Sequence, residues 1–242
     1  MKTKLMIAAV GAACAGLALA RDPRPEELVE HPVSENLRGH EDIEWSTSYA
    51  YDLVKSGCER PRVLLVGDSI CAQYQAGVRK ALAGKMNVTY WASSYCVTSP
   101  GYLKLLDFYL NEADYAVVHF NNGLHSLQTP TADWAKGFEA AVRLVRARQP
   151  KAKLVWTTAT PLADTAKTAK SRELNAAAAK ILERYPEVAV DDLFSTLDPL
   201  DRKEYWSDPY HFKPAGVKVM VGQVSSCCLG FLGRVAENAP SK

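Results

Sequence analysis

The sequence predicts a doubly wound, three-layer α/β domain with a mainly parallel sheet of five strands. Short apolar runs alternate along the chain with longer segments of helical period, and the runs themselves contain few polar residues. Such runs are typical of parallel strands that helices cover on both faces of the sheet. With 48% hydrophobic residues in 242, the chain is long enough to form one domain with a full core.

The elements follow in order from residue 61 onward. Apolar runs predict strands at 63–66, 88–91, 115–120, 154–158 and 188–190. Helical periodicity predicts helices at 74–82, 102–110, 134–148, 171–185 and 214–232. In a sheet of this kind, polar residues at the carboxyl ends of the strands converge on one crevice.

The ends of the chain differ from this pattern. Residues 1–20 combine a basic start, an apolar stretch and the small residues Ala18 and Ala20, which predicts a signal peptide cleaved after Ala20. The mature protein is then expected to be secreted or periplasmic. Residues 21–60 read as a charged arm followed by one amphipathic helix at 44–55, residues 61–235 as the α/β domain, and residues 236–242 as a tail.

Net charge and hydropathy limit the classes of partner and substrate that we expect for this protein. The net charge of +2 provides no basic stripe, so we expect no nucleic-acid partner. After residue 20 no apolar segment approaches the length of a membrane span. These features favour a small-molecule or polysaccharide substrate and leave the oligomeric state open.

The cysteines suggest disulfides. Of six cysteines, Cys14 lies in the predicted signal peptide, and the odd number that remains leaves at least one unpaired. Cys71 and Cys96 follow neighbouring strands, so a disulfide between them is one expectation. A weaker one joins Cys58 to Cys227 or Cys228, and the alternative for all five is a role as small buried hydrophobes.

Two short segments carry groups for nucleophilic catalysis. Gly67-Asp68-Ser69 directly follows the first strand, and Asp208-Pro209-Tyr210-His211 precedes the last helix. A serine hydroxyl is a weak nucleophile until a base takes its proton, and the base needs an orienting partner. We therefore predict Ser69, His211 and Asp208 as the catalytic residues of a serine hydrolase. Asp68 is expected to fix the turn.

Three blocks of the sequence resemble the SGNH, or GDSL-like, hydrolase superfamily. They read VLLVGDSI from residue 63, VVHFNNGLH from residue 117 and DPYHFKPAG from residue 208, and the likeness covers about residues 61–228. The third of the family's blocks has here the form Asn-x-Gly-Leu-His. The resemblance implies a flavodoxin-like fold and a carboxylic ester hydrolase, with Ser69 as nucleophile.

The resemblance also implies donors for the oxyanion. The family uses the amide of its serine, a side-chain amide from block three and a glycine amide from block two. Here these roles fall to Ser69 and to Asn121, which we favour over Asn122. Block two has no matching glycine, and we take Val97 as its counterpart, with Cys96 as the alternative.

The expected reaction is removal of a short acyl group, most plausibly acetyl, from a carbohydrate hydroxyl. Tyr210 and Tyr95 flank the motif loops and are candidate substrate contacts, because aromatic rings stack on sugars. The alternatives are a lipid esterase or thioesterase, an O-acyltransferase and an inactive carbohydrate-binding protein. We expect no cofactor and no metal, since the spacing of His119 and His125 fits no usual zinc pattern.

Overall fold

The computed structural model describes residues 25, 27, 41–54, 57–99 and 101–232, and these form one six-stranded sheet with helices on both faces. The strand order is β1-β3-β2-β4-β5-β6. β1 pairs antiparallel with β3, and all the other pairs are parallel. The strands are β1 (Ser46–Ala50), β2 (Arg62–Gly67), β3 (Asn87–Ser93), β4 (Val117–Phe120), β5 (Lys153–Thr157) and β6 (Ala189–Asp191).

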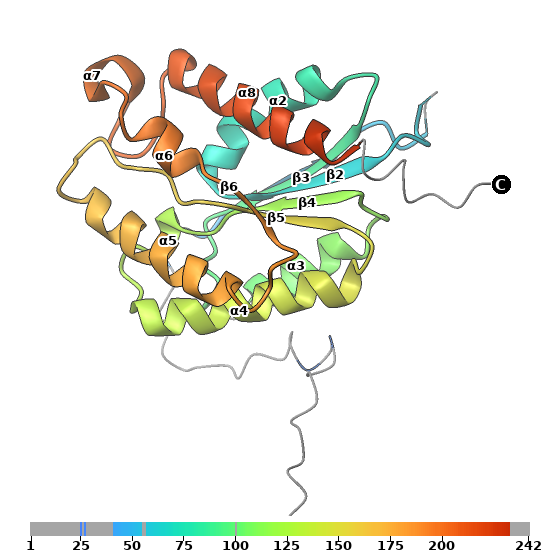
Figure 1. The fold of residues 1–242 in the computed structure, drawn as a ribbon, viewed down its shortest axis with the longest axis horizontal. Helices are drawn as coiled ribbons and strands as arrows, with labels where there is room; N and C mark the ends of the chain where they lie inside the picture. The colour runs from blue at the N-terminus through green and yellow to red at the C-terminus, as the bar shows by residue number, and fades with distance from the viewer. Residues whose placement is uncertain (1–24, 26, 28–40, 55–56, 100, 233–242) are drawn as a thin grey trace, which may run out of the picture.

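The helices form a layer on each side of the sheet (Figure 1). On one side lie α2 (Ser69–Leu82), α6 (Leu193–Leu197), α7 (Arg202–Tyr205) and α8 (Pro214–Gly230), and on the other α3 (Tyr102–Leu110), α4 (Thr131–Arg148) and α5 (Thr168–Leu182). A single 3-10 turn, η1 (Leu124–Ser126), follows β4. The three-layer architecture and the five parallel strands predicted from the sequence are confirmed.

The predicted helix at 44–55 is wrong. Residues 46–50 form β1, an edge strand whose register pairs Ser46 with Ser93 and Ala50 with Thr89. Four of its five residues are exposed, so no apolar run marks it in the sequence. The strand instead owes its conformation to backbone bonding with β3 and to contacts such as Trp91 Nε1 donating to Ser46 Oγ over 2.8 Å.

Two hydrophobic clusters fill the space between the sheet and its helix layers. One lies on the α3, α4 and α5 side and contains Trp91, Phe120, Trp134 and Trp156. We call the other the α2/α8 face, and its cluster contains Tyr74, Met220 and Val224 among others. Successive residues of β2, β4 and β5 point into opposite clusters, which explains why these strands are apolar at most positions.

The predicted disulfides are absent, since all five cysteines of the described chain are free. Cys71 belongs to the cluster on the α2/α8 face and Cys96 to the opposite cluster, so the sheet separates them. Cys58 is exposed, whereas Cys228 is buried in the core under α8. Burial raises the pKa of the Cys71 thiol to about 12. The buried thiols thus act as small core hydrophobes.

Several sequence-based predictions concern residues outside the described part. The signal peptide at 1–20 and the tail at 236–242 both lie there, as does most of the arm at 21–40. Within the described part, none of the helices is both long enough and apolar enough to cross a bilayer.

Candidate active site

Ser69 lies where β2 turns sharply into α2. Gly67 ends the strand, and a Cβ atom there would lie only 2.6 Å from Cβ of Cys71, so a larger residue would push the first helical turn away. Asp68 is the N-cap, and its Oδ1 accepts the Ile70 amide over 2.9 Å. Ser69 is the first helical residue, and its amide points out of the helix end without a partner in the described chain.

The three predicted catalytic side chains form a continuous hydrogen-bonded chain. His211 Nε2 lies 2.8 Å from Ser69 Oγ, and His211 Nδ1 lies 2.8 Å from Asp208 Oδ2. With Nδ1–H donating to the carboxylate, Nε2 is left to accept the serine proton. Residues 142 positions apart in the sequence thereby take up the geometry that a serine nucleophile and its base require.

The turn that carries Asp208 and His211 is fixed by its own hydrogen bonds. Asp208 Oδ1 accepts the amides of Tyr210 and His211, each over 2.8 Å. Burial alone would raise the pKa of Asp208, but these two amides and the His211 ring bind the charged form and hold that pKa below its usual range. Asp208 is therefore ionised at neutral pH and keeps the imidazole in one orientation.

Gln73 joins this turn to the serine helix, and sequence reasoning missed it. Its Nε2 donates to the Phe212 carbonyl over 3.0 Å, and its Oε1 accepts the Phe212 amide over 3.2 Å. Gln73 stands four residues after Ser69 on α2, hence on the same face of the helix. That spacing is the signal that could have identified it. The two bonds hold the His211 turn against the helix that carries Ser69.

The two candidate asparagines point to opposite faces of the sheet. Asn121 lines a small cavity on the α2/α8 face together with Asp68 and Ile70, which flank Ser69, and its Nδ2 donates to the Thr157 carbonyl over 2.6 Å. One hydrogen of that amide remains for a ligand. Asn121 therefore lies on the face that carries the serine and histidine.

Both polar atoms of the Asn122 side chain are already hydrogen-bonded to other groups of the protein. Its Oδ1 accepts the Val97 amide and the Ser126 hydroxyl, each over 3.1 Å, and its Nδ2 donates to the Tyr95 carbonyl over 2.8 Å. Trp134 Nε1 donates to its backbone carbonyl over 3.2 Å. These bonds tie the loops after β3 and β4 together and favour a structural role for Asn122.

The same network bears on the third oxyanion donor. Because the Val97 amide already donates to Asn122, it is not free to bind an oxyanion in this structure, and this speaks against our first choice. The Cys96 amide, the alternative, has no acceptor among the described residues. Of the two block-two candidates, only the Cys96 amide is therefore without an acceptor in the described part of the chain.

The two tyrosines proposed as substrate contacts differ in exposure. The Tyr210 side chain, next to His211, is 44% exposed. Tyr95 is partly buried, and its ring packs on the opposite cluster with its edge 3.4 Å from the position of a Cβ at Gly101. Tyr210 is therefore the better placed of the two for a ligand.

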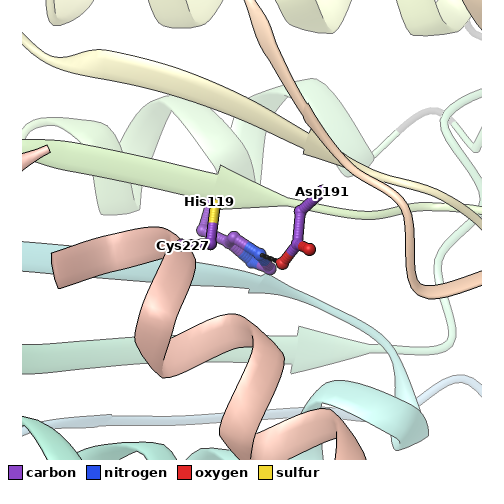
Figure 2. Close-up of side chains that lie close together, drawn as sticks. All are labelled: His119, Asp191 and Cys227. Carbon is purple, nitrogen blue, oxygen red and sulfur yellow. Dashed lines mark hydrogen bonds and ion pairs between the residues drawn. The ribbon is translucent and has the colours of Figure 1, made fainter. Parts of the chain in front are cut away.

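A second histidine–aspartate pair lies buried in the core (Figure 2). His119 of β4 and Asp191 at the end of β6 are joined by a 2.8 Å bond between Nε2 and Oδ2, and Cys227 of α8 lies beside them. The ligand atoms of these three residues all lie within 4.8 Å of one another and could approach a metal ion. Asp191 is already bound by His119 and by Gln223 Nε2, which donates over 2.6 Å, so the protein satisfies this carboxylate by itself.

Similar solved structures share this architecture. A carbohydrate esterase of family 3 from Talaromyces cellulolyticus aligns with a TM-score of 0.62 and 14% identity, covering 72% of this chain and 99% of that one. An acetyl esterase, solved as a serine-to-alanine mutant with an acetate ion, gives a TM-score of 0.60 at 14% identity, covering 72% of this chain and 99% of that one. The aryl esterase of M. smegmatis gives 0.56 at 16% identity, with 71% and 100% covered.

No family model matches the chain, and no curated protein matches it in sequence. At such low identity the structural likeness establishes the fold alone. The chain has the fold of the SGNH hydrolases, as the three sequence blocks predicted, since similar structures include a putative SGNH hydrolase from Slackia heliotrinireducens with a TM-score of 0.54 and a member of the G-D-S-L family from Veillonella parvula with 0.57. The strand order places Ser69 after β2 and Asn121 after β4, at the switch point where sheets of this topology bind ligands.

Proposed function

We propose that the protein is an exported serine esterase that removes short acyl groups, chiefly acetyl, from carbohydrate hydroxyls through an acyl-serine intermediate. The observation that carries the proposal is the hydrogen-bonded chain from Ser69 through His211 to Asp208. Export rests on the predicted signal peptide at 1–20.

In the first half of the reaction, Ser69 Oγ attacks the ester carbonyl while its proton passes to His211 Nε2. Negative charge develops on the carbonyl oxygen, where the Ser69 amide at the start of α2, the Asn121 side chain and the Cys96 amide are the proposed donors. The tetrahedral adduct then collapses. The carbon–oxygen bond to the alcohol breaks, and that oxygen takes the proton from His211.

The second half repeats these steps with water. His211 removes a proton from a water molecule, and the hydroxide attacks the acyl carbon of the acyl-serine. Collapse of the second adduct breaks the bond to Ser69 Oγ, which takes the proton back and releases the free acid. Asp208 stays ionised throughout and stabilises the imidazolium.

The choice of an acetylated carbohydrate has two supports. Similar structures include a carbohydrate esterase of family 3 and an acetyl esterase solved with an acetate ion. In this chain the exposed ring of Tyr210 directly precedes the proposed base and could stack on a sugar that forms the leaving group.

The test uses two substrate series with the chain from Arg21 onward. A series of p-nitrophenyl esters from acetate to octanoate measures acyl length, and acetate release from acetylated xylo-oligosaccharides measures action on a sugar. We expect kcat/KM to be highest for acetate and acetate to be released from the oligosaccharide. A rate that rises beyond four carbons would support a lipid esterase instead. Oligosaccharide that gains acyl groups from an aryl ester would support a transferase.

A further inference from the structure

A short segment ahead of β1, residues 41–45, is anchored at two points far apart in the sequence, and we call it the strap. At one end Glu41 Oε1 accepts a bond from His125 Nδ1 over 2.7 Å. At the other end Trp45 exchanges bonds with Ser94: the Trp45 amide donates to Ser94 Oγ over 2.8 Å and the Ser94 amide to the Trp45 carbonyl over 3.1 Å. Glu44 adds a 2.5 Å bond from Ser94 Oγ to its Oε2.

These anchors determine the path of the strap. Ser94 directly follows β3, and His125 lies in the turn after β4. Because β2 lies between β3 and β4 in the sheet, a segment joined to both loops must cross the carboxyl end of β2. Ser69 begins the helix at that end. The strap therefore crosses the end of the sheet at which Ser69 lies.

The Trp45 side chain of the strap faces the catalytic side of the sheet. The Trp45 ring packs partly buried against the cluster on the α2/α8 face, the face that carries Ser69 and His211. It also meets the His125 ring edge-on, with the ring centroids 6.0 Å apart. Trp45 and His125 thus place two contacting aromatic rings at this part of the edge, and we call them the aromatic wall.

The opposite flank of Ser69 belongs to the turn with His211. This turn is bonded toward the β5 side of the sheet, where the Ala163 amide donates to the Pro209 carbonyl over 3.0 Å. Since His211 must return its proton to the leaving oxygen, the alcohol part of an ester lies on that flank. The acyl part then points away from His211, toward the loops after β3 and β4 that the strap covers.

We propose that the strap is the specificity-determining wall of the acyl site, and that the Trp45 ring sets the longest acyl chain that fits beside Ser69. This inference rests on the proposed esterase function. Loss of the ring opens space on the acyl side without touching Ser69, His211 or Asp208. A pocket that gains or loses one methylene changes kcat/KM about 10- to 200-fold.

The test compares the ratio of kcat/KM for p-nitrophenyl butyrate to that for p-nitrophenyl acetate in the wild type, Trp45→Ala and Tyr49→Ala. Tyr49 is also aromatic but lies in β1, outside the strap, where it is 56% exposed and pairs with Tyr90 in the middle of β3. We expect Trp45→Ala to raise the ratio about tenfold, and Tyr49→Ala to leave it within twofold. Should Trp45→Ala fail to fold, Glu41→Gln loosens the same strap, and we expect a smaller rise.

The outcomes separate the two proposals. Activity that depends on Ser69, with a ratio unchanged in Trp45→Ala and in Glu41→Gln, overturns the strap proposal and leaves the esterase intact. An equal rise in Tyr49→Ala also overturns it, because the effect would not be specific to the wall. If the wild type hydrolyses neither ester, the esterase proposal falls and the strap proposal falls with it.

Discussion

Two histidine–aspartate pairs in this molecule share a 2.8 Å contact but differ in their exposure, their separation in the sequence and their surroundings. In the pair beside Ser69, the side chains of His211 and Asp208 are 33% and 45% exposed, whereas those of His119 and Asp191 are 0% and 3% exposed. The outer pair lies three residues apart in one turn, and the inner pair joins β4 to β6. Contact distance alone therefore does not identify a catalytic pair.

The surroundings of the two pairs account for the difference. Nε2 of His211 faces a serine hydroxyl at the start of a helix, so a proton taken from Ser69 can be passed on to a substrate. Nε2 of His119 is enclosed by Asp191 and by Thr157 Oγ1, which lies 2.7 Å away. The inner pair is thus placed to hold strands together, whereas the outer pair has the contacts that its proposed role in proton transfer requires.

The largest effect should come from removing the outer histidine. We expect His211→Ala to lower kcat by roughly four to six orders of magnitude, because Ser69 then lacks its base. The matched change in the core, His119→Gln, should keep kcat within about tenfold and act on stability instead. Ester hydrolysis at equal folded concentration measures both. A larger loss of kcat in His119→Gln would reverse the assignment of the two pairs.

Next in size is the effect of the outer aspartate. Asp208→Asn should lower kcat by about three to four orders of magnitude, since an amide can hold the ring in the wrong tautomer. The same variant should change the free energy of unfolding by less than about 1 kcal/mol, because the pair is exposed. Urea unfolding and initial rates test the two statements. Near-normal turnover would remove Asp208 from the mechanism.

The inner aspartate should affect stability in a way that depends on pH. Burial would raise the pKa of Asp191, but the bond and charge of His119 and the bond from Gln223 outweigh it and hold that pKa below its usual range. The ionised Asp191 therefore stabilises the folded protein fully above the unfolded carboxyl pKa of about 3.9. This stabilisation is lost as the pH falls through the lower pKa of the folded state. We expect Asp191→Asn to cost about 3–5 kcal/mol at pH 7.

This pH dependence is checked by urea unfolding of wild type and Asp191→Asn at several pH values. The difference in unfolding free energy should shrink in acid, as the wild-type carboxylate takes up a proton. A difference that stays constant from neutral pH to acid would mean that Asp191 does not titrate with a lowered pKa in the folded protein.

The smallest of these effects concerns the two asparagines. Asn121→Ala should lower kcat by about two to three orders of magnitude with little change in stability, because one donor to the oxyanion is lost. Asn122→Ala should mainly lower the unfolding free energy, since it leaves buried partners such as the Val97 amide unsatisfied. Rates and unfolding curves for both variants distinguish the roles. The reverse pattern would move the oxyanion role to Asn122.

The fold could be predicted from the sequence because buried strands and helices produce apolar runs and helical periodicity that are easily recognised. Four of the five parallel strands, β2 to β5, are buried at nearly every position, and the helix Tyr102–Leu110 begins and ends where its periodicity does. β1 escaped prediction because an exposed edge strand lacks an apolar run, and its conformation depends on pairing with a strand 43 residues further on.

Only those residues of the candidate site that stand in short sequence motifs could be predicted. Ser69, Asp208 and His211 stand in segments whose neighbours define a turn, so their convergence follows from the strand order. Two other features depend on packing between distant segments. These are the hydrogen bond from the Val97 amide to Asn122 and the pairing of His119 with Asp191. No local sequence pattern predicts such contacts. The contacts that hold the strap at the carboxyl end of β2 also join distant segments and could not be predicted either.

The most direct test of the central claim compares hydrolysis of p-nitrophenyl acetate by the chain from Arg21 onward with that by its Ser69→Ala form, at equal folded concentration. The account predicts turnover by the wild type and a loss of at least about three orders of magnitude in kcat when the hydroxyl is removed. Equal rates in the two forms would show that Ser69 is not the nucleophile and would contradict the assignment of the outer histidine–aspartate pair to catalysis.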